Sequence, residues 1–118
     1  LLDEGTAAAE AMAMAHALTR QKKNIFFVHE NTFPQTLEVI RTRALPLGFE
    51  VKVGSFDDCP WADTFAVYTQ YPGADGTLSD FQKWSDRIHA EKGFMIASTD
   101  LLALTLYKPP GEMGADIV

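Results

Sequence analysis

Asp100 is the side chain of this sequence that is best placed to do chemistry. It lies shortly after the apolar run 94–97, which predicts a strand buried inside a sheet. A carboxylate at the end of such a strand can hold a cationic ring nitrogen or a metal ion where water does not screen the charge. Asp is also a favoured N-cap residue, so the alternative interpretation is that Asp100 caps a short helix that begins at Leu101.

Gly5 and Thr6 form a second candidate site, at the start of an alanine-rich helix. The segment 3–19 holds seven alanines between Ala7 and Ala17, which favours a helix because alanine loses no side-chain entropy on entering one. Free amides at a helix start bind anions such as phosphate, and this is the functional interpretation. The alternative is that the glycine lets the helix pack closely against a neighbour. The helix lacks a wide polar face, so we expect it to lie inside a larger body.

The other chemically capable side chains are less promising. His29 and Glu30 could act as acid and base, but neighbours at a strand end point in opposite directions, which favours a hydrogen-bonded or solvent-facing pair. Cys59 follows two carboxylates, which would raise its pKa and make it a poor nucleophile. The sequence contains no dinucleotide-binding, P-loop, zinc-protease or nucleophile-elbow motif. These absences argue against a free-standing nucleotide-binding domain or hydrolase. No catalytic residue and no metal ligand is predicted in this chain.

Strand and helix signals alternate along the chain. Continuous apolar runs at 25–28 and 94–97 predict strands buried in a parallel sheet, and the strict alternation at 49–53 predicts a strand near the sheet edge. A further strand is expected at 65–70. Thr32 and Gln35 have the spacing of a capping box, and Pro34 suits the first turn of a helix that follows. Further helices are expected at 3–19, from Ser79 or Asp80 to Gly93, and briefly at 101–107, with a closing strand at 115–118.

This alternation predicts a three-layer α/β sandwich with a mainly parallel sheet. We expect residues 1–118 to form a single α/β unit, since the length allows one core. Ligands of such sheets bind beyond the carboxyl ends of the strands. The segments 29–33, 71–76 and 98–100 should therefore share one rim.

Composition excludes several classes of partner. The net charge of −6 argues against a nucleic-acid surface, which needs clustered lysine and arginine. No apolar run approaches the roughly 18 residues that a membrane-spanning helix needs. The single cysteine fits a reducing compartment. We expect neither a nucleic-acid partner nor a membrane partner.

Seven short stretches, in order along the chain, resemble the glycine decarboxylase P-protein family of the glycine cleavage system. Each alone is a weak signal, whereas together they are specific. The stretches are LLDEGTAAAEA at 1–11, PQT at 34–36, RTRA at 41–44, QYPG at 70–73, TDLLAL at 99–104, PPGE at 109–112 and GADIV at 114–118. The match is to the N-terminal half of the long P-protein, or to the first subunit of split forms.

The resemblance implies part of the large domain of a fold-type-I pyridoxal-phosphate enzyme. The family is an oxidoreductase that decarboxylates glycine and passes the aminomethyl group to the lipoyl arm of the H-protein. The N-terminal half lacks the lysine that binds pyridoxal phosphate, and in this chain the corresponding position would lie beyond Val118. Asp100 corresponds approximately to the aspartate that pairs with the pyridine nitrogen in the catalytic half, and here that role is expected to be vestigial. Phe33 departs from the family, which more often has histidine there.

The resemblance also implies the partners. They are the lipoylated H-protein and the catalytic half or second P-protein subunit, in a dimer or heterotetramer. The compartment would be the cytoplasm in a bacterium and the mitochondrial matrix in a eukaryote. On this interpretation the segment is scaffold and interface, inactive by itself. The alternative is a free-standing, non-catalytic α/β interaction domain of flavodoxin-like type.

Overall fold

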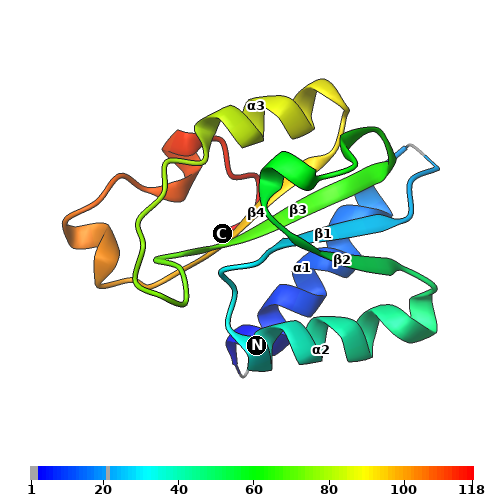
Figure 1. Cartoon of the computed structure of the whole chain (residues 1–118), viewed down its shortest axis with the longest axis horizontal. Coiled ribbons are helices and arrows are strands. Elements are labelled where there is room, and N and C mark those ends of the chain that lie inside the picture. Colours follow the sequence, from blue (N-terminus) through cyan, green and yellow to red (C-terminus); the bar gives the residue numbers. More distant parts are fainter. Residues whose placement is uncertain (1–2, 21) are drawn as a thin grey trace.

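A four-stranded parallel sheet forms the centre of the computed structural model, which describes residues 3–20 and 22–118. The strand order is β2-β1-β3-β4. The strands are β1 (Ile25–His29), β2 (Glu50–Gly54), β3 (Thr64–Tyr71) and β4 (Phe94–Thr99). Helices α1 (Glu4–Leu18) and α2 (Pro34–Ala44) cover one face, and α3 (Gln82–Ala90) covers the other (Figure 1). The predicted three-layer α/β sandwich is confirmed, and β2 lies at the sheet edge as expected.

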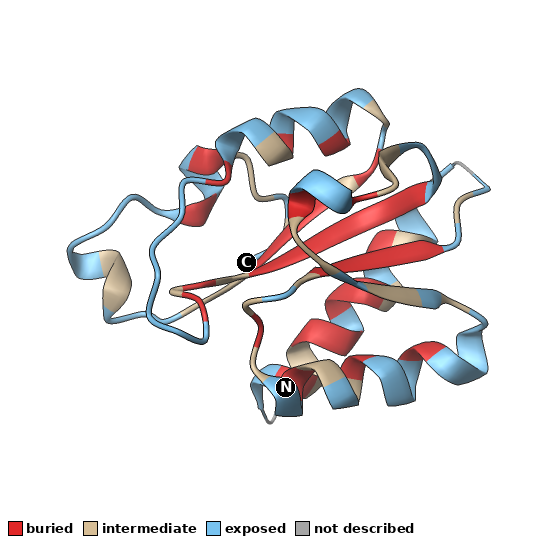
Figure 2. Cartoon of the chain, in the orientation of Figure 1, coloured by how far each residue is buried: buried red, intermediate tan, exposed pale blue. Residues whose placement is uncertain are grey.

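Two apolar cores lie on the two faces of the sheet. Beneath α1 and α2, Met12 and Ile40 pack with strand residues such as Phe26. Beneath α3, Ile88 packs with residues such as Met95. Strands β1 and β3 are buried along most of their length and β4 in its middle, which are the red ribbons in Figure 2, whereas the edge strand β2 has no buried residue. Continuous apolar runs produce this result because both faces of a central parallel strand are covered by helices.

Helix α1 occupies the predicted segment, with Asp3 as its N-cap and Thr19 as its C-cap. Its alanines are small, so the helix lies close to its neighbours, and Ala9 and Ala15 are almost fully buried. Met14 and Leu18 remain exposed. None of the helices in the described ranges is long and apolar enough to cross a membrane.

The predicted capping box of α2 is wrong. The N-cap is Phe33 and no side chain caps the helix. Pro34 is the first helical residue, as predicted, and a residue before proline is held in extended backbone, which places Phe33 at the cap position. The Thr32 hydroxyl is buried and has no hydrogen-bond partner within the described part of the chain. Helix α3 also begins later than predicted, at Gln82, whose amide donates to the Asp80 carboxylate at 2.9 Å.

The C-terminal segment is less regular than predicted. The expected helix at 101–107 is reduced to a 3-10 turn at Ala103–Thr105, and the expected strand at 115–118 makes one parallel bridge, Ile96 to Ile117. Asp116 explains the interrupted pairing, because its carboxylate accepts the Met95 amide at 2.8 Å in place of a backbone carbonyl. The same carboxylate oxygen lies 2.8 Å from Nε2 of His89, so a hydrogen bond joins α3 to the C-terminal segment.

Gly93 lies between α3 and β4 and tests how closely α3 packs against the sheet. A Cβ atom there would lie 2.7 Å from Cδ1 of Ile88 and 2.8 Å from the Phe65 carbonyl oxygen. We predict that Gly93→Ala lowers the free energy of unfolding by about 1–3 kcal/mol, because the turn into β4 must shift. Gly111→Ala is the matched control, since nothing lies within 4 Å of its Cβ position. Urea denaturation measures both variants, and equal midpoints for the two would contradict the prediction.

Candidate functional site

The carboxyl ends of β1, β3 and β4 meet at one rim, as predicted. The Asp100 amide donates to the Tyr71 carbonyl at 3.3 Å, which joins the ends of β4 and β3. The Phe33 amide donates to Oε1 of Gln70 at 3.0 Å, which joins the loop after β1 to β3. The three loops that the sequence assigned to a shared rim are therefore in contact.

Asn31 and Asp75 hold two of these loops together. The Asn31 side-chain amide donates to Oδ1 of Asp75 at 2.6 Å, and the Asp75 amide donates back to Oδ1 of Asn31 at 3.1 Å. Asn31 and, secondly, Thr77 lower the pKa of Asp75 to about 2 by hydrogen bonding to its carboxylate. A Cβ at Gly73 would clash with the Asn31 side-chain amide, so a larger residue there would displace Asn31 from this pair. This pair fixes the rim on the β1 side.

A cavity of about 1050 Å³ opens between the start of α1 and the ends of β3 and β4. Its apolar wall includes Ala8 and Ile96. The described residues that line it include four carboxylates but no lysine, arginine or histidine. The four are Asp3, Glu4, Glu10 and Asp100. The cavity is therefore electronegative.

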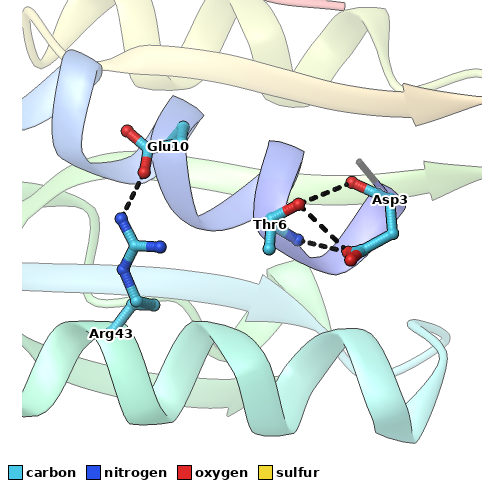
Figure 3. Close-up of polar contacts among 4 residues, drawn as sticks. All are labelled: Asp3, Thr6, Glu10 and Arg43. Atoms are coloured by element: carbon cyan, nitrogen blue, oxygen red, sulfur yellow. Dashed lines mark hydrogen bonds and ion pairs between the residues drawn. The ribbon is translucent and has the colours of Figure 1, made fainter. Parts of the chain in front are cut away.

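The start of α1 is capped by its own carboxylate. The Thr6 amide donates to Oδ1 of Asp3 at 2.7 Å, and the Thr6 hydroxyl donates to the Asp3 carbonyl at 3.0 Å (Figure 3). The Thr6 amide is also the main reason that the pKa of Asp3 is lowered. Gly5 lies against α2, since its Cβ position is 3.0 Å from Cγ2 of Val39. Close packing thus explains Gly5, and the assignment of Gly5 and Thr6 to cofactor binding stays a prediction.

Asp100 is exposed and caps the turn that follows it. Its carboxylate accepts the Leu102 amide at 2.9 Å, and its carbonyl accepts the Ala103 amide at 3.1 Å. The capping alternative is therefore visible in the geometry. A cofactor contact of Asp100 stays a prediction.

Tyr68 is a rim residue that sequence reasoning missed. It lies within β3, is only 1% exposed, and lines the cavity. Burial raises its pKa to about 12, with the Ser98 hydroxyl opposing the shift and the Glu4 carboxylate adding to it. The residue was overlooked because an aromatic side chain inside an apolar strand looks like ordinary core. Only the position of α1 shows that its hydroxyl lies near Glu4.

The remaining candidates take structural positions. Nδ1 of His29 accepts the Asn31 amide at 3.2 Å, and burial lowers the His29 pKa. Burial raises the pKa of Cys59 to about 11, so the predicted direction is right, although burial and not the neighbouring carboxylates is the cause. In the described ranges, no three His, Cys, Asp or Glu side chains converge as a metal site.

A sequence profile of the family described as "Glycine cleavage system P-protein" matches residues 1–118. The chain belongs to this P-protein family. It is 52% identical over 117 residues to the glycine dehydrogenase (decarboxylating) of Cupriavidus metallidurans, and 50% identical to that of Paraburkholderia phytofirmans. Each match covers 99% of the chain and 12% of the relative. The chain thus spans about an eighth of the curated P-proteins it matches, and the resemblance found in the sequence is confirmed.

Solved structures show the same fold. A glycine decarboxylase P-protein in inhibitor-bound form superposes with a TM-score of 0.86 at 27% identity, over 97% of this chain and 27% of the other. A methionine gamma lyase from Micromonospora echinospora gives a TM-score of 0.70 at 19% identity, over 95% of this chain and 31% of the other. A putative O-acetylhomoserine (thiol)-lyase from Campylobacter jejuni, solved with a pyridoxyl-lysine phosphate, gives a TM-score of 0.72 at 18% identity. The match covers 96% of this chain and 28% of the other. The P-protein segment therefore has the fold of pyridoxal-phosphate enzymes of fold type I.

The Asn31 and Asp75 pair makes a measurable prediction for the rim of this P-protein segment. We predict that Asn31→Ala raises the pKa of Asp75 from about 2 toward its ordinary 3.8, because the strongest donor to the carboxylate is removed. In the wild type, the contribution of Asp75 to stability is complete above pH 3.8 and is lost as the pH falls through about 2. The stability of the variant should depend less on pH between 3.8 and about 2.

NMR titration of the Asp75 carboxyl carbon measures this shift. Asn24→Ala is the control, since Asn24 donates to the Gly48 carbonyl far from the rim. An unchanged Asp75 pKa in the Asn31 variant would show that the hydrogen bond from Asn31 does not stabilise the carboxylate.

Proposed function

We propose that this chain is a segment of glycine dehydrogenase (decarboxylating), the P-protein of the glycine cleavage system. The observation that carries the proposal is the family match over residues 1–118, supported by 52% identity to a curated member. The reaction we assign to the whole protein is decarboxylation of glycine with transfer of the aminomethyl group to the lipoyl arm of the H-protein. Pyridoxal phosphate, when bound, supplies the electron sink for this chemistry.

Within that protein we assign the segment to the half that does not bind the cofactor. A phosphate group does not fit the cavity described above, because its described lining offers four carboxylates and no cation. At the start of α1, the Thr6 amide already donates to Asp3. None of the described lining residues is a lysine that could bind the cofactor covalently. The segment supplies a rigid sheet and a surface instead of a catalytic group.

The exposed apolar residues support an interface role. Leu101, Leu102 and Leu106 are 80%, 74% and 81% exposed on the loop after β4. Water contact of such side chains is unfavourable, so we assign their cover to the catalytic half or second subunit of the P-protein. The whole assembly would be a dimer or heterotetramer that works with lipoylated H-protein, in the cytoplasm of a bacterium or the mitochondrial matrix of a eukaryote.

The whole protein provides the test. The full-length protein that contains this chain is expected to release labelled CO₂ from carboxyl-labelled glycine when pyridoxal phosphate and lipoylated H-protein are both supplied. Omission of the H-protein is the control and should lower the release strongly. No glycine-dependent release under the complete conditions would refute the assignment.

Asp100 tests whether this half of the protein takes part in the reaction. We predict that Asp100→Ala in the full-length enzyme lowers kcat/KM for glycine by less than about tenfold, because the carboxylate caps the Leu102 amide and does not hold the reacting group. Asp86→Ala, at an exposed position of α3, is the matched control. A loss of about 100-fold or more, the size of a removed electrostatic contact to the reacting centre, would place Asp100 in the active site.

Cofactor binding by the segment itself can be measured separately. Addition of pyridoxal phosphate to the 118-residue chain is expected to produce no absorbance band of protein-bound cofactor. Circular dichroism of the same sample checks that the chain is folded. A saturable band would show that this half holds the cofactor after all.

A further inference from the structure

A second, smaller pocket lies on the sheet face that α3 covers, opposite the face that α1 and α2 cover (Figure 1). It sits at the carboxyl ends of β1 and β3 and has a volume of about 90 Å³. Phe56, Phe81 and Trp84 form its aromatic walls. Its described lining contains no aspartate, glutamate, lysine or arginine, so the pocket has neither a carboxylate nor a permanent cation.

Thr69 and His29 lie side by side in this pocket. The pairing of β1 with β3 places Val28 beside Tyr68. The next residues along the two strands, His29 and Thr69, therefore point together to the face that α3 covers. Thr69 is 7% exposed, and its hydroxyl has no hydrogen-bond partner within the described part of the chain. It is not among the hydroxyl oxygens that the chain encloses completely, so it is open to the pocket.

The ring of His29 supplies an N–H donor next to this hydroxyl. Its Nδ1 accepts the Asn31 amide at 3.2 Å, so in the neutral ring the proton is on Nε2. Burial lowers the pKa of His29, with Glu30 and Asp75 opposing the shift, and the neutral ring is favoured. Nε2 has no hydrogen-bond partner in the residues that the structure describes, and it is not enclosed. The ring lines the pocket beside Phe56, with ring centroids 4.8 Å apart.

The pocket thus combines an N–H donor with a neighbouring hydroxyl that can accept. A primary carboxamide matches this pair, because its carbonyl accepts the His29 N–H and its NH₂ group donates to the Thr69 oxygen. An ammonium group does not match, because the His29 N–H cannot accept a hydrogen bond. A carboxylate is disfavoured, since the lining has no permanent cation and Asn31 holds the ionised Asp75, whose pKa is about 2, close by. Flat aromatic walls suit a planar amide.

We propose that this pocket binds a primary carboxamide group, with the carbonyl on Nε2 of His29 and the amide nitrogen on the Thr69 hydroxyl. A water molecule needs about 10–15 Å³ of space, so about 90 Å³ accommodates a ligand of roughly six non-hydrogen atoms. Two sources carry this group, a free small amide and the side chain of an asparagine or glutamine from another part of the full-length protein. The site lies on the α3 face of the sheet and is independent of the glycine reaction.

Ligand-observed NMR on the full-length protein tests the site, with acetamide as the probe. Acetate has nearly the same shape but a negative charge, so it is the matched control ligand. The wild type is expected to bind acetamide saturably with a Kd on the order of 1–10 mM, because so small a ligand makes few contacts. Acetate should bind about tenfold more weakly or not at all, because the pocket offers no cation.

Variants of the two polar residues test the assigned contacts. Thr69→Val keeps the shape of the side chain and should weaken acetamide binding about threefold to tenfold, because one hydrogen bond is lost. Thr69→Ser keeps the hydroxyl and should restore most of the affinity. His29→Phe keeps a ring beside Phe56 and should weaken binding by a similar factor to Thr69→Val. Thr42→Val, at an exposed position of α2, is the control and should bind as the wild type does. Circular dichroism checks that each variant is folded.

A crystal structure of the full-length protein separates the two sources. If an asparagine or glutamine of the same protein fills the pocket, its side-chain amide lies within hydrogen-bond distance of His29 and Thr69, and acetamide does not bind. Saturable acetamide binding that Thr69→Val weakens and Thr69→Ser keeps supports the free amide. The proposal is overturned if acetamide does not bind and the pocket holds only water. It is also overturned if Thr69→Val and His29→Phe bind acetamide as tightly as the wild type, or if acetate binds as tightly as acetamide.

Discussion

The parallel pairing of β3 with β1 on one side and β4 on the other is the constraint on which the rest of the structure depends. Register partners Tyr68 and Ile96 sit side by side, and the same ladder aligns Gln70 with Ser98. Because all strands point the same way, every loop that leaves a strand end arrives at one edge of the sheet. The rim, the cavity and the contacts to α1 all follow from this alignment.

The second determining feature is the close approach of α1 to the sheet and to α2. Alanine and glycine allow it, since a side chain at Gly5 would lie within 3.0 Å of Val39. The approach brings the first turn of the helix, with Asp3 and Glu4, to the ends of β3 and β4. Here the positive end of the helix dipole meets the chain's own carboxylates instead of an external anion. A helix start of this kind can bind a phosphate, but here its own carboxylates make the neighbouring cavity electronegative.

This conversion is consistent with a P-protein half that keeps the fold of its family without holding the cofactor. The sheet and its helices retain the arrangement of fold-type-I enzymes, as the TM-score of 0.86 to a solved P-protein shows. Backbone amides at the rim already donate to side chains of this chain: the Thr6 amide donates to Asp3 and the Leu102 amide donates to Asp100. Fold and site are separable, because the core depends on apolar burial whereas the site depends on a few polar groups.

The sequence by itself determined the fold class, the four strands of the sheet and the family, because strand burial leaves apolar patterns in short segments and each of the seven motifs is a short contiguous stretch. It also predicted α1 to within a residue, since helix propensity and capping act over short separations. It mispredicted the cap of α2, where Pro34 fixed the backbone of Phe33 and displaced Thr32. Only the tertiary structure decided that Tyr68, Ser98 and Glu4 belong to one cavity, because they come from three different elements. Contacts between such distant residues arise from strand register and helix packing, which no local pattern records.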